Sequence, residues 1–260
     1  TLDNRNSGKL SSLYGNLDAR LSSSLLNSGT GALVSQKNLT VTAGKLDNSA
    51  KGNITSAGAQ TLHVSGLLNN AQGGVIDSGA ALDLSAHDLD NTTGSIKGTT
   101  ATILDLAGTL TNTRGKLSSG GPLLIQRAMQ IDNQGGELVS RSLLTLLTVG
   151  LDNRNRGTVA ADGRLEISAS GLVKNSNDGL IYSQDADLKL TANRLDNVKG
   201  KVQSKISLHL DIAEDLDKQG GKLIAQDGDL NLKATNLDNR GGELASLKAA
   251  LDARVVGVLR

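Results

Sequence analysis

Residues 237–246 read LDNRGGELAS, and residues 131–140 read IDNQGGELVS. The two decamers agree at seven of ten positions, although they start 106 residues apart. The triplet LDN or a close variant occurs twelve times, with gaps of 20 to 23 residues between successive copies. Eleven copies end in asparagine and one ends in Lys218: Asn4, Asn27, Asn48, Asn70, Asn91, Asn112, Asn133, Asn153, Asn175, Asn197 and Asn239. The chain is therefore built from a repeat of about 21 residues.

Each repeat contains three short stretches with strand character. The triplet is followed by a glycine-containing turn and by an alternating stretch such as ELAS, and then by an alternating apolar pair such as Leu230 and Leu232. Alternation of apolar and polar residues predicts strands, and Gly, Asn and Asp between them predict turns. Because one repeat cannot bury its apolar face alone, repeats must stack on one another. The sequence predicts an all-β, right-handed parallel β-helix, or solenoid, of roughly twelve coils, forming a single domain over residues 1–260.

Composition supports a narrow, regular core and excludes several classes of protein. The chain has no Cys, Trp or Phe, and its net charge is +1. A balanced charge gives no electrostatic footprint for nucleic acid. The longest apolar run, LLTLLTV at 143–149, is far shorter than the ~20 residues that span a bilayer. We expect no nucleic-acid partner, no membrane insertion of this segment and no disulfide framework.

The asparagines of the triplet are the predicted structural residues. In a strand, alternation places Leu and Asn of L-D-N inside and Asp outside. A buried amide needs hydrogen-bond partners, and asparagines stacked coil upon coil can supply them to one another. We expect an Asn ladder formed by the eleven asparagines given above. Lys218 is expected to point outward or to distort its coil.

The remaining polar residues predict no catalytic, cofactor or metal site. Eight aspartates occupy the middle of the triplet, and we expect each to accept a backbone N–H at its turn. The glycine- and aspartate-rich calcium motif of other solenoids is absent. His63 and His209 lie about seven repeats apart, and His87 is elsewhere, so they cannot share a metal. The two tyrosines, Tyr14 and Tyr182, are expected to be partly buried packing residues.

Several other repeat architectures fit the sequence less well. Polysaccharide-cleaving β-helices carry long loops, and gaps of 20 to 23 residues leave no room for them. An ice-binding solenoid needs a ladder of Thr-x-Thr. Thr40 and Thr42 supply one rung, but no matching rung occupies the same slot in other repeats. The leucine-rich repeat has a similar period but a different spacing of leucines.

The recurring LDNRGGELAS, IDNQGGELVS and LDNVKGKVQS, with the intervening L-x-L pair, resemble the repeats of filamentous haemagglutinin and related two-partner secretion exoproteins. The contact-dependent growth inhibition toxins belong to the same group. The resemblance covers essentially the whole chain, but neither an amino-terminal secretion motif of the NPN type nor a VENN boundary is present. We therefore interpret the chain as an internal segment of a longer filament.

The resemblance implies a secreted or cell-surface protein of a Gram-negative bacterium, exported through an outer-membrane two-partner secretion transporter. The favoured function is a non-enzymatic stalk that projects a receptor-binding or toxin region, with any cell-surface receptor bound by regions outside this segment. The alternative is that the solenoid face itself is an adhesin. A polysaccharide-active enzyme is a distant third.

Overall fold

The computed structural model describes all 260 residues, Thr1–Arg260. The chain divides into two compact units, unit 1 (Thr1–Met129) and unit 2 (Gln130–Arg260). Each unit is all-β and has no helix, and each winds as a parallel β-solenoid of six coils, about twelve in all. The expected fold class is thus confirmed. The structure contains no helix with the length and hydropathy that crossing a membrane requires.

Each coil has three faces, named here by their order after the Asn turn. In unit 1 the first face consists of β2 (Lys9–Ser12), β5 (Ala32–Ser35), β8 (Asn53–Ser56), β11 (Val75–Ser78), β14 (Ser95–Gly98) and β17 (Lys116–Ser119). The second consists of β3 (Leu17–Arg20), β6 (Leu39–Ala43), β9 (Gln60–Val64), β12 (Leu82–Ala86), β15 (Thr102–Leu106) and the start of β18 (Leu123–Asp132). The third consists of β1 (Leu2–Asp3), β4 (Ser24–Leu26), β7 (Lys45–Asp47), β10 (Leu67–Asn69), β13 (Asp88–Asp90) and β16 (Thr109–Thr111).

Unit 2 repeats the same order of faces. Its first face consists of β19 (Glu137–Ser140), β21 (Thr158–Ala161), β24 (Leu180–Ser183), β27 (Lys201–Ser204), β30 (Lys222–Ala225) and β33 (Glu243–Ser246). The second consists of β20 (Leu144–Asp152), β22 (Leu165–Ala169), β25 (Leu188–Ala192), β28 (Leu208–Ile212), β31 (Leu230–Ala234) and β34 (Leu251–Val255). The third consists of β23 (Leu172–Lys174), β26 (Arg194–Asp196), β29 (Asp215–Asp217) and β32 (Asn236–Asp238).

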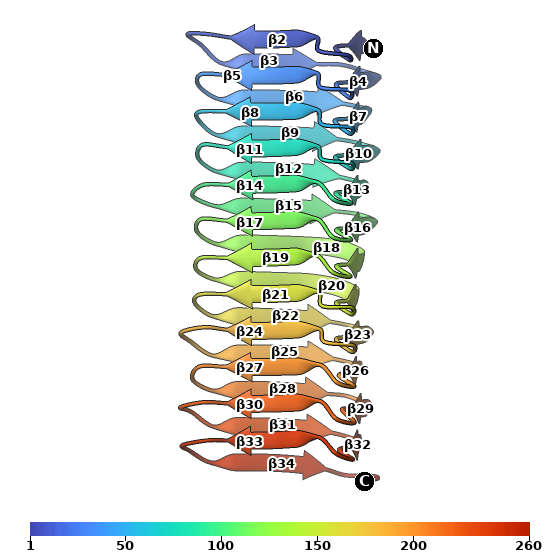
Figure 1. The fold of residues 1–260 in the computed structure, drawn as a ribbon, viewed down its shortest axis with the longest axis vertical. Helices are drawn as coiled ribbons and strands as arrows, with labels where there is room; N and C mark the ends of the chain where they lie inside the picture. Colours follow the sequence, from blue (N-terminus) through green and yellow to red (C-terminus); the bar gives the residue numbers. More distant parts are fainter. The chain divides into compact units, whose positions relative to one another are not determined.

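Within each unit, every strand pairs in parallel with the equivalent strand one coil away (Figure 1). On the first face of unit 1, Ile54 pairs with Leu33 on one side and with Ile76 on the other. All three side chains are fully buried. Because the strands are in register, like side chains stack on like, and the core is a set of aliphatic columns that needs no aromatic filler.

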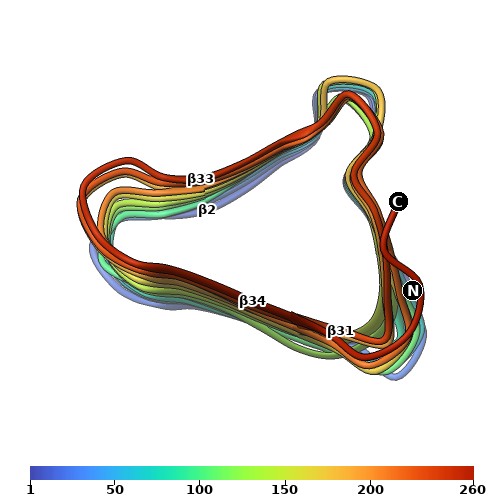
Figure 2. The same cartoon turned by 90° about the horizontal axis from the view of Figure 1, so that it is seen from below.

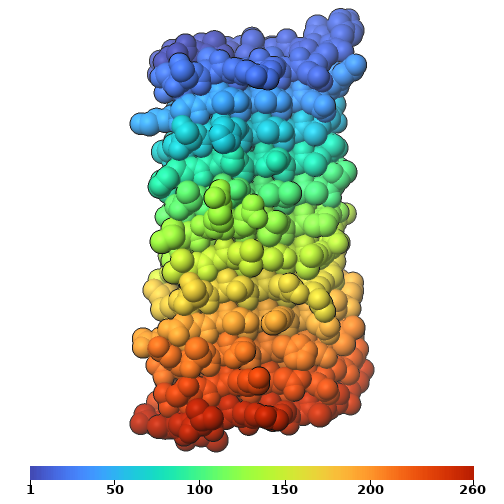
Figure 3. Space-filling model, turned by 180° about the vertical axis from the view of Figure 1, so that it is seen from behind, coloured from blue at the N-terminus to red at the C-terminus, as the bar shows by residue number.

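The last coils of unit 2, in orange and red in Figure 2, close into a three-sided loop when viewed along the stacking direction. β33 and β34 form the two long sides of its last coils, and the short third-face strands form the remaining side. In the face that Figure 3 shows, each coil of unit 2 presents a layer of side chains, and no long loop stands out from the layers.

Two strands differ from the expected three short strands per coil. β18 and β20 are 10 and 9 residues long and run through the corner between the second and third faces. Elsewhere a bend such as Ser170–Gly171 separates the two strands. The coil that contains β20 also has the shortest gap, 20 residues between Asn133 and Asn153. The number of residues at the corner does not cause the difference, since Leu144 and Asn153 lie nine positions apart, as do Leu82 and Asn91, between which a bend divides the strands.

Candidate functional site

The asparagines of the triplet form a buried column of hydrogen bonds in each unit, called here the Asn column. At the steps given below, the side-chain amide donates to the amide oxygen of the next asparagine along the chain. In unit 1 the Nδ2–Oδ1 distances are 2.7–2.8 Å for the five steps from Asn4 through Asn27, Asn48, Asn70 and Asn91 to Asn112. In unit 2 they are 2.7–2.8 Å for the three steps from Asn133 through Asn153 and Asn175 to Asn197. The column therefore has a direction, from the amino-terminal to the carboxyl-terminal coil.

Each amide nitrogen also ties the turn of its own coil to the strand of the next. The Nδ2 of Asn153 donates to the carbonyl of Gly157 at 3.0 Å, to that of Leu180 at 3.1 Å and to Oδ1 of Asn175 at 2.8 Å. Its own Oδ1 accepts from Asn133. Asn153 is fully buried, so these bonds replace the water that the amide has lost.

A glycine follows each asparagine by three or four residues because the turn closes tightly against the column. A Cβ placed on Gly179 would lie 2.5 Å from the carbonyl oxygen of Asn153 and 2.6 Å from both Oδ1 and the carbonyl oxygen of Asn175. Two of these oxygens belong to the backbone and the third belongs to the Asn column, so none of the three can move aside. The glycine is required for close approach, and its own backbone is not left-handed.

The residues just before that glycine adopt the left-handed conformation. In the shorter turn after Asn133, one residue does so, Gly135 at φ 63°. In the longer turn after Asn153, two do so, Asn155 at φ 57° and Arg156 at φ 67°. The two turn lengths account for the three- and four-residue spacing between asparagine and glycine. They also account for part of the variation in period.

The eight aspartates of the triplet each make the same local hydrogen bond at the outer side of the turn. Their Oδ1 atoms accept the backbone N–H of the residue two positions later, at 2.9–3.3 Å: Arg5, Ser49, Thr92, Gln134, Arg154, Val198, Gln219 and Arg240. This is the turn hydrogen bond that the sequence predicts. No group of three or more His, Asp or Glu side chains lies close enough together to hold a metal ion.

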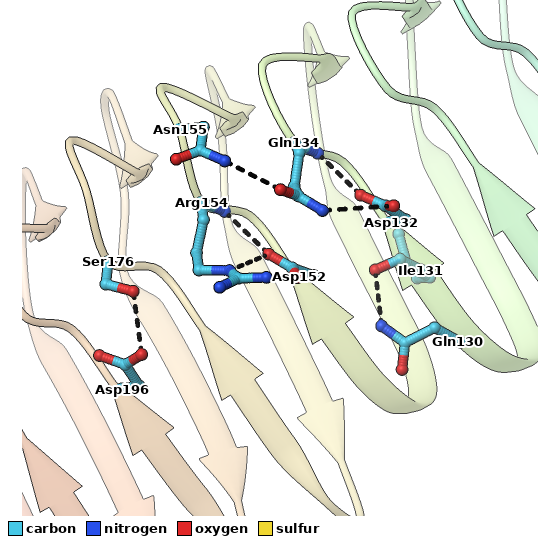
Figure 4. A network of polar contacts seen from close by, with 9 residues as sticks. All are labelled: Gln130, Ile131, Asp132, Gln134, Asp152, Arg154, Asn155, Ser176 and Asp196. Atoms are coloured by element: carbon cyan, nitrogen blue, oxygen red, sulfur yellow. Dashed lines mark hydrogen bonds and ion pairs between the residues drawn. The ribbon is translucent and has the colours of Figure 1, made fainter.

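One of these aspartates is less exposed than the sequence suggests. Asp152 is only 8% exposed because Arg154 covers it, with an Nη2–Oδ2 distance of 2.7 Å (Figure 4). Burial opposes ionisation of this carboxyl, but hydrogen bonds from the side chain and backbone of Arg154 hold its pKa below the ordinary value. Neighbouring turns in Figure 4 use uncharged partners instead, Gln134 for Asp132 and Ser176 for Asp196.

The expectation that Lys218 points outward is wrong. Its side chain is fully buried, and Nζ donates to Oδ1 of Asn239, as the amide of an asparagine would. Burial lowers the pKa of Lys218 to about 8, against an attraction from the Glu243 carboxylate that raises it. Strand alternation points residue 218 to the interior. The aliphatic stem of the lysine packs there, and its Nζ takes the place of an asparagine amide nitrogen in the Asn column.

A column of serines lies at the end of the first face, and sequence reasoning missed it. The hydroxyl of Ser78 donates to the carbonyl of Ala81 at 2.8 Å, and that of Ser183 donates to the carbonyl of Gly163 at 2.8 Å. The buried members are Ser35, Ser56, Ser78, Ser119, Ser140, Ser183 and Ser204. Serine recurs as the last residue of both decamers, so the periodicity contained the signal. These hydroxyls satisfy carbonyls at the bend between the first and second faces.

The residues considered for ligand binding or catalysis remain scattered on the surface. Tyr14 is 89% exposed, so its expected packing role is wrong, whereas Tyr182 is half-buried. His63 Nδ1 lies 2.6 Å from the hydroxyl of Ser85. However, Asp105 pairs with Ser85 and not with His63, and its carboxylate binds Arg127. The arrangement lacks the carboxylate behind the imidazole that a catalytic triad requires.

The stacked coils, the Asn column and the glycine turns define a repeat protein of the parallel β-solenoid class. A model of the haemagglutinin repeat matches residues 12–71, 55–114, 114–217 and 207–253. The chain belongs to the haemagglutinin repeat family. Such repeats are typical of secreted or cell-surface bacterial proteins and point to a filamentous-haemagglutinin-like adhesin or stalk. No curated protein and no solved structure matches the chain.

Proposed function

We propose that this chain is a stalk segment of a two-partner secretion exoprotein of a Gram-negative bacterium. In this role it holds a receptor-binding or toxin region away from the cell surface, after export through an outer-membrane transporter partner. A contact-dependent growth inhibition toxin and an adhesin are both parents of this kind. The segment acts without a cofactor and without catalysis.

One observation carries this proposal, namely that successive coils of a unit are bound to one another by repeated, self-contained contacts. Asn175 receives its bond from Asn153 and gives one to Asn197. Backbone pairing joins the same coils on all three faces, as for β24 with β27. Coils joined by the same repeated contacts are suited to setting a distance, because the length of the segment scales with their number.

A second candidate is that the solenoid face itself binds a receptor, and a specific observation favours it. Leu147 and Val149 on β20 are each 42% exposed, and Leu172 on β23 is 37% exposed. Leu147 and Val149 lie two residues apart on one strand, and a contiguous patch of exposed apolar side chains marks an interaction site. These three residues lie within two consecutive coils of unit 2, so the two candidates can be separated by deletion.

Deletion of Gln134–Asn175 in the full-length exoprotein removes those two coils and joins Asn133 to Ser176 in register. A stalk is expected to keep its fold and the binding or toxic activity of its distal region, with reach reduced by about 10 Å at ~4.8 Å per coil. Reach is measured by electron microscopy of the displayed filament, and activity is measured by target-cell binding at equal surface export.

Two matched variants complete the test. Replacement of Gln134–Asn175 by two copies of Ser176–Asn197 restores two coils in register and contains none of the large exposed apolar residues. The double substitution of Leu147 and Val149 by Ser keeps the original length. Loss of binding in both variants, with export intact, would identify the face as the adhesin and contradict the stalk. Turnover of a polysaccharide by the purified segment would contradict the non-enzymatic role.

A further inference from the structure

The rung of the Asn column at Lys218 makes fewer hydrogen bonds than the asparagine rungs of the same unit. Asn153 accepts one bond and donates three. Lys218 donates one side-chain bond, to Oδ1 of Asn239. A protonated amine cannot accept, so the column is interrupted between Asn197 and Lys218. The Nδ2 of Asn197 keeps only its two carbonyl acceptors, Gly200 at 3.3 Å and Lys222 at 3.2 Å.

The rest of the coil contact is intact, which confines the defect to the column. The backbone N–H of Asn197 still donates to the carbonyl of Asp217 at 2.7 Å, and that of Lys218 donates to the carbonyl of Asp238 at 2.9 Å. β27 pairs with β30 in full register. The coil that carries Lys218 therefore folds like its neighbours, with one side-chain link missing.

The charges around Lys218 do not neutralise it. Glu243, on the strand that follows the next turn, attracts the ammonium but is itself paired with Lys222 at 2.9 Å. The side chains of Asp217 and Asp238 lie on the opposite side of the strand, and each is bound at its own turn by Gln219 or Arg240. Nζ instead occupies the space over Gly242, where a Cβ would lie 2.7 Å from it. An ammonium with three donors and one acceptor is held in a dry slot.

We propose that the step between Asn197 and Lys218 is a built-in opening point of unit 2, where the coils separate first and where loss of a proton from Lys218 strengthens the closed state. A neutral amine has a lone pair, so it can accept a hydrogen bond from Asn197 while it donates one to Asn239. The coil pair is thus weakest while the lysine is charged. If the chain is a stalk segment as proposed, a pulling force or partial unfolding would separate the coils at this step first.

The direction of the pH effect follows from the two states of the lysine. The closed coil binds the proton with a pKa of about 8, and the open coil binds it with the ordinary value of 10.5. Below about pH 8 both states are charged, and the cost of the buried charge is fully present. Between these two pH values the open state binds more protons, so stability of the closed coil rises with pH.

Hydrogen exchange of the intact chain tests the proposal, with protection factors corrected for intrinsic exchange at pH 7 and pH 9.5. At pH 7 the coils around residues 198–239 are expected to open about tenfold more often than those around 154–197, the factor that one lost hydrogen bond gives. Raising the pH to 9.5 should reduce this opening by about tenfold. Lys218→Asn should remove both the excess opening and its pH dependence.

Two further variants separate the lysine from its position in the chain. Asn175→Lys should create a second opening point with the same pH dependence around residues 154–197. Lys218→Met removes the charge and keeps the stem, so its opening should not vary with pH. Unchanged exchange in Lys218→Asn, or exchange around 198–239 that does not vary with pH in the unsubstituted chain, would overturn the proposal.

Discussion

Adjacent residues of the triplet point to opposite sides of their strand. Asn153 is fully buried in the Asn column, whereas Asp152 lies on the outer side of the same strand and binds Arg154. Strand alternation alone dictates that the two side chains point in opposite directions. The column satisfies the buried amide, and the local turn satisfies the carboxylate.

Substitution of the two residues should separate these roles. Asn153→Ala leaves Oδ1 of Asn175 without its donor and removes one acceptor from Asn133, so it should lower the free energy of unfolding by about 2–3 kcal/mol. Asp152→Asn keeps an acceptor for the turn N–H and loses only a partly exposed ion pair, at a cost of about 1 kcal/mol or less. Denaturant unfolding with hydrogen exchange measures both. A larger loss for Asp152→Asn would contradict the assigned directions.

At the scale of the element, the turn after each asparagine requires at least one residue with left-handed backbone. In some repeats a residue other than glycine, which is strained in this conformation, occupies that position. Thr93 has φ 56°, whereas Gly135 holds the equivalent position at φ 63°. A β-branched side chain is strained in this region, and glycine is not.

Exchanging these residues should change stability in opposite directions. Thr93→Gly should raise the free energy of unfolding by about 0.5–1 kcal/mol, because relief of strain exceeds the added entropy of the unfolded chain. Gly135→Thr should lower it by about 1–2 kcal/mol. Thermal unfolding of the two variants decides the matter, and a stabilised Gly135→Thr would show that the turn conformation is not the cause.

The glycine that closes the turn against the Asn column predicts a different kind of defect. Gly179→Ala places a methyl group against fixed backbone oxygens and should cost about 1–3 kcal/mol as overpacking. Gly15 is the control, because a Cβ there meets only the hydroxyl of Ser12, at 3.5 Å. Gly15→Ala should be neutral or slightly stabilising. Equal losses in the two variants would exclude close approach as the reason for the glycine.

Much of this element structure follows from periodicity in the sequence. The alternation of Leu230 and Leu232 predicts a strand, and both residues are buried on β31. Alternation places residue 218 inside, but the prediction gave more weight to the cost of burying a charge. That cost is reduced by an acceptor, Asn239, supplied by the next coil. The curved β20 and the exposure of Tyr14 depend likewise on the space around them and not on a repeating pattern.

At the scale of the whole molecule, stability is expected to be a sum of coils and of contacts between adjacent coils. Asn27 and Asn91 of unit 1 share no hydrogen bond, whereas Asn70 donates directly to Asn91. Two alanine substitutions in adjacent coils should therefore lower stability by a different total from two substitutions in distant coils.

Double substitutions to alanine test this additivity. The losses for Asn27→Ala and Asn91→Ala should add to within about 0.5 kcal/mol. The loss in the double variant Asn70→Ala, Asn91→Ala should be smaller than the sum of the two single losses, because the bond that the two residues share is lost only once. Each free energy comes from denaturant unfolding of unit 1. Strict additivity of the adjacent pair would mean that the column does not couple neighbouring coils.

The one-way direction of the Asn column also bears on how such a gene can change. A coil with asparagine at its rung accepts one amide bond from the coil before it and gives an identical bond to the coil after it, as Asn153 does. Duplication or loss of one whole repeat by unequal recombination therefore leaves no amide unmatched. A break within a repeat would leave one. Single-residue changes are tolerated in the turns, but the number of coils can change only by whole repeats if every buried amide is to stay bonded.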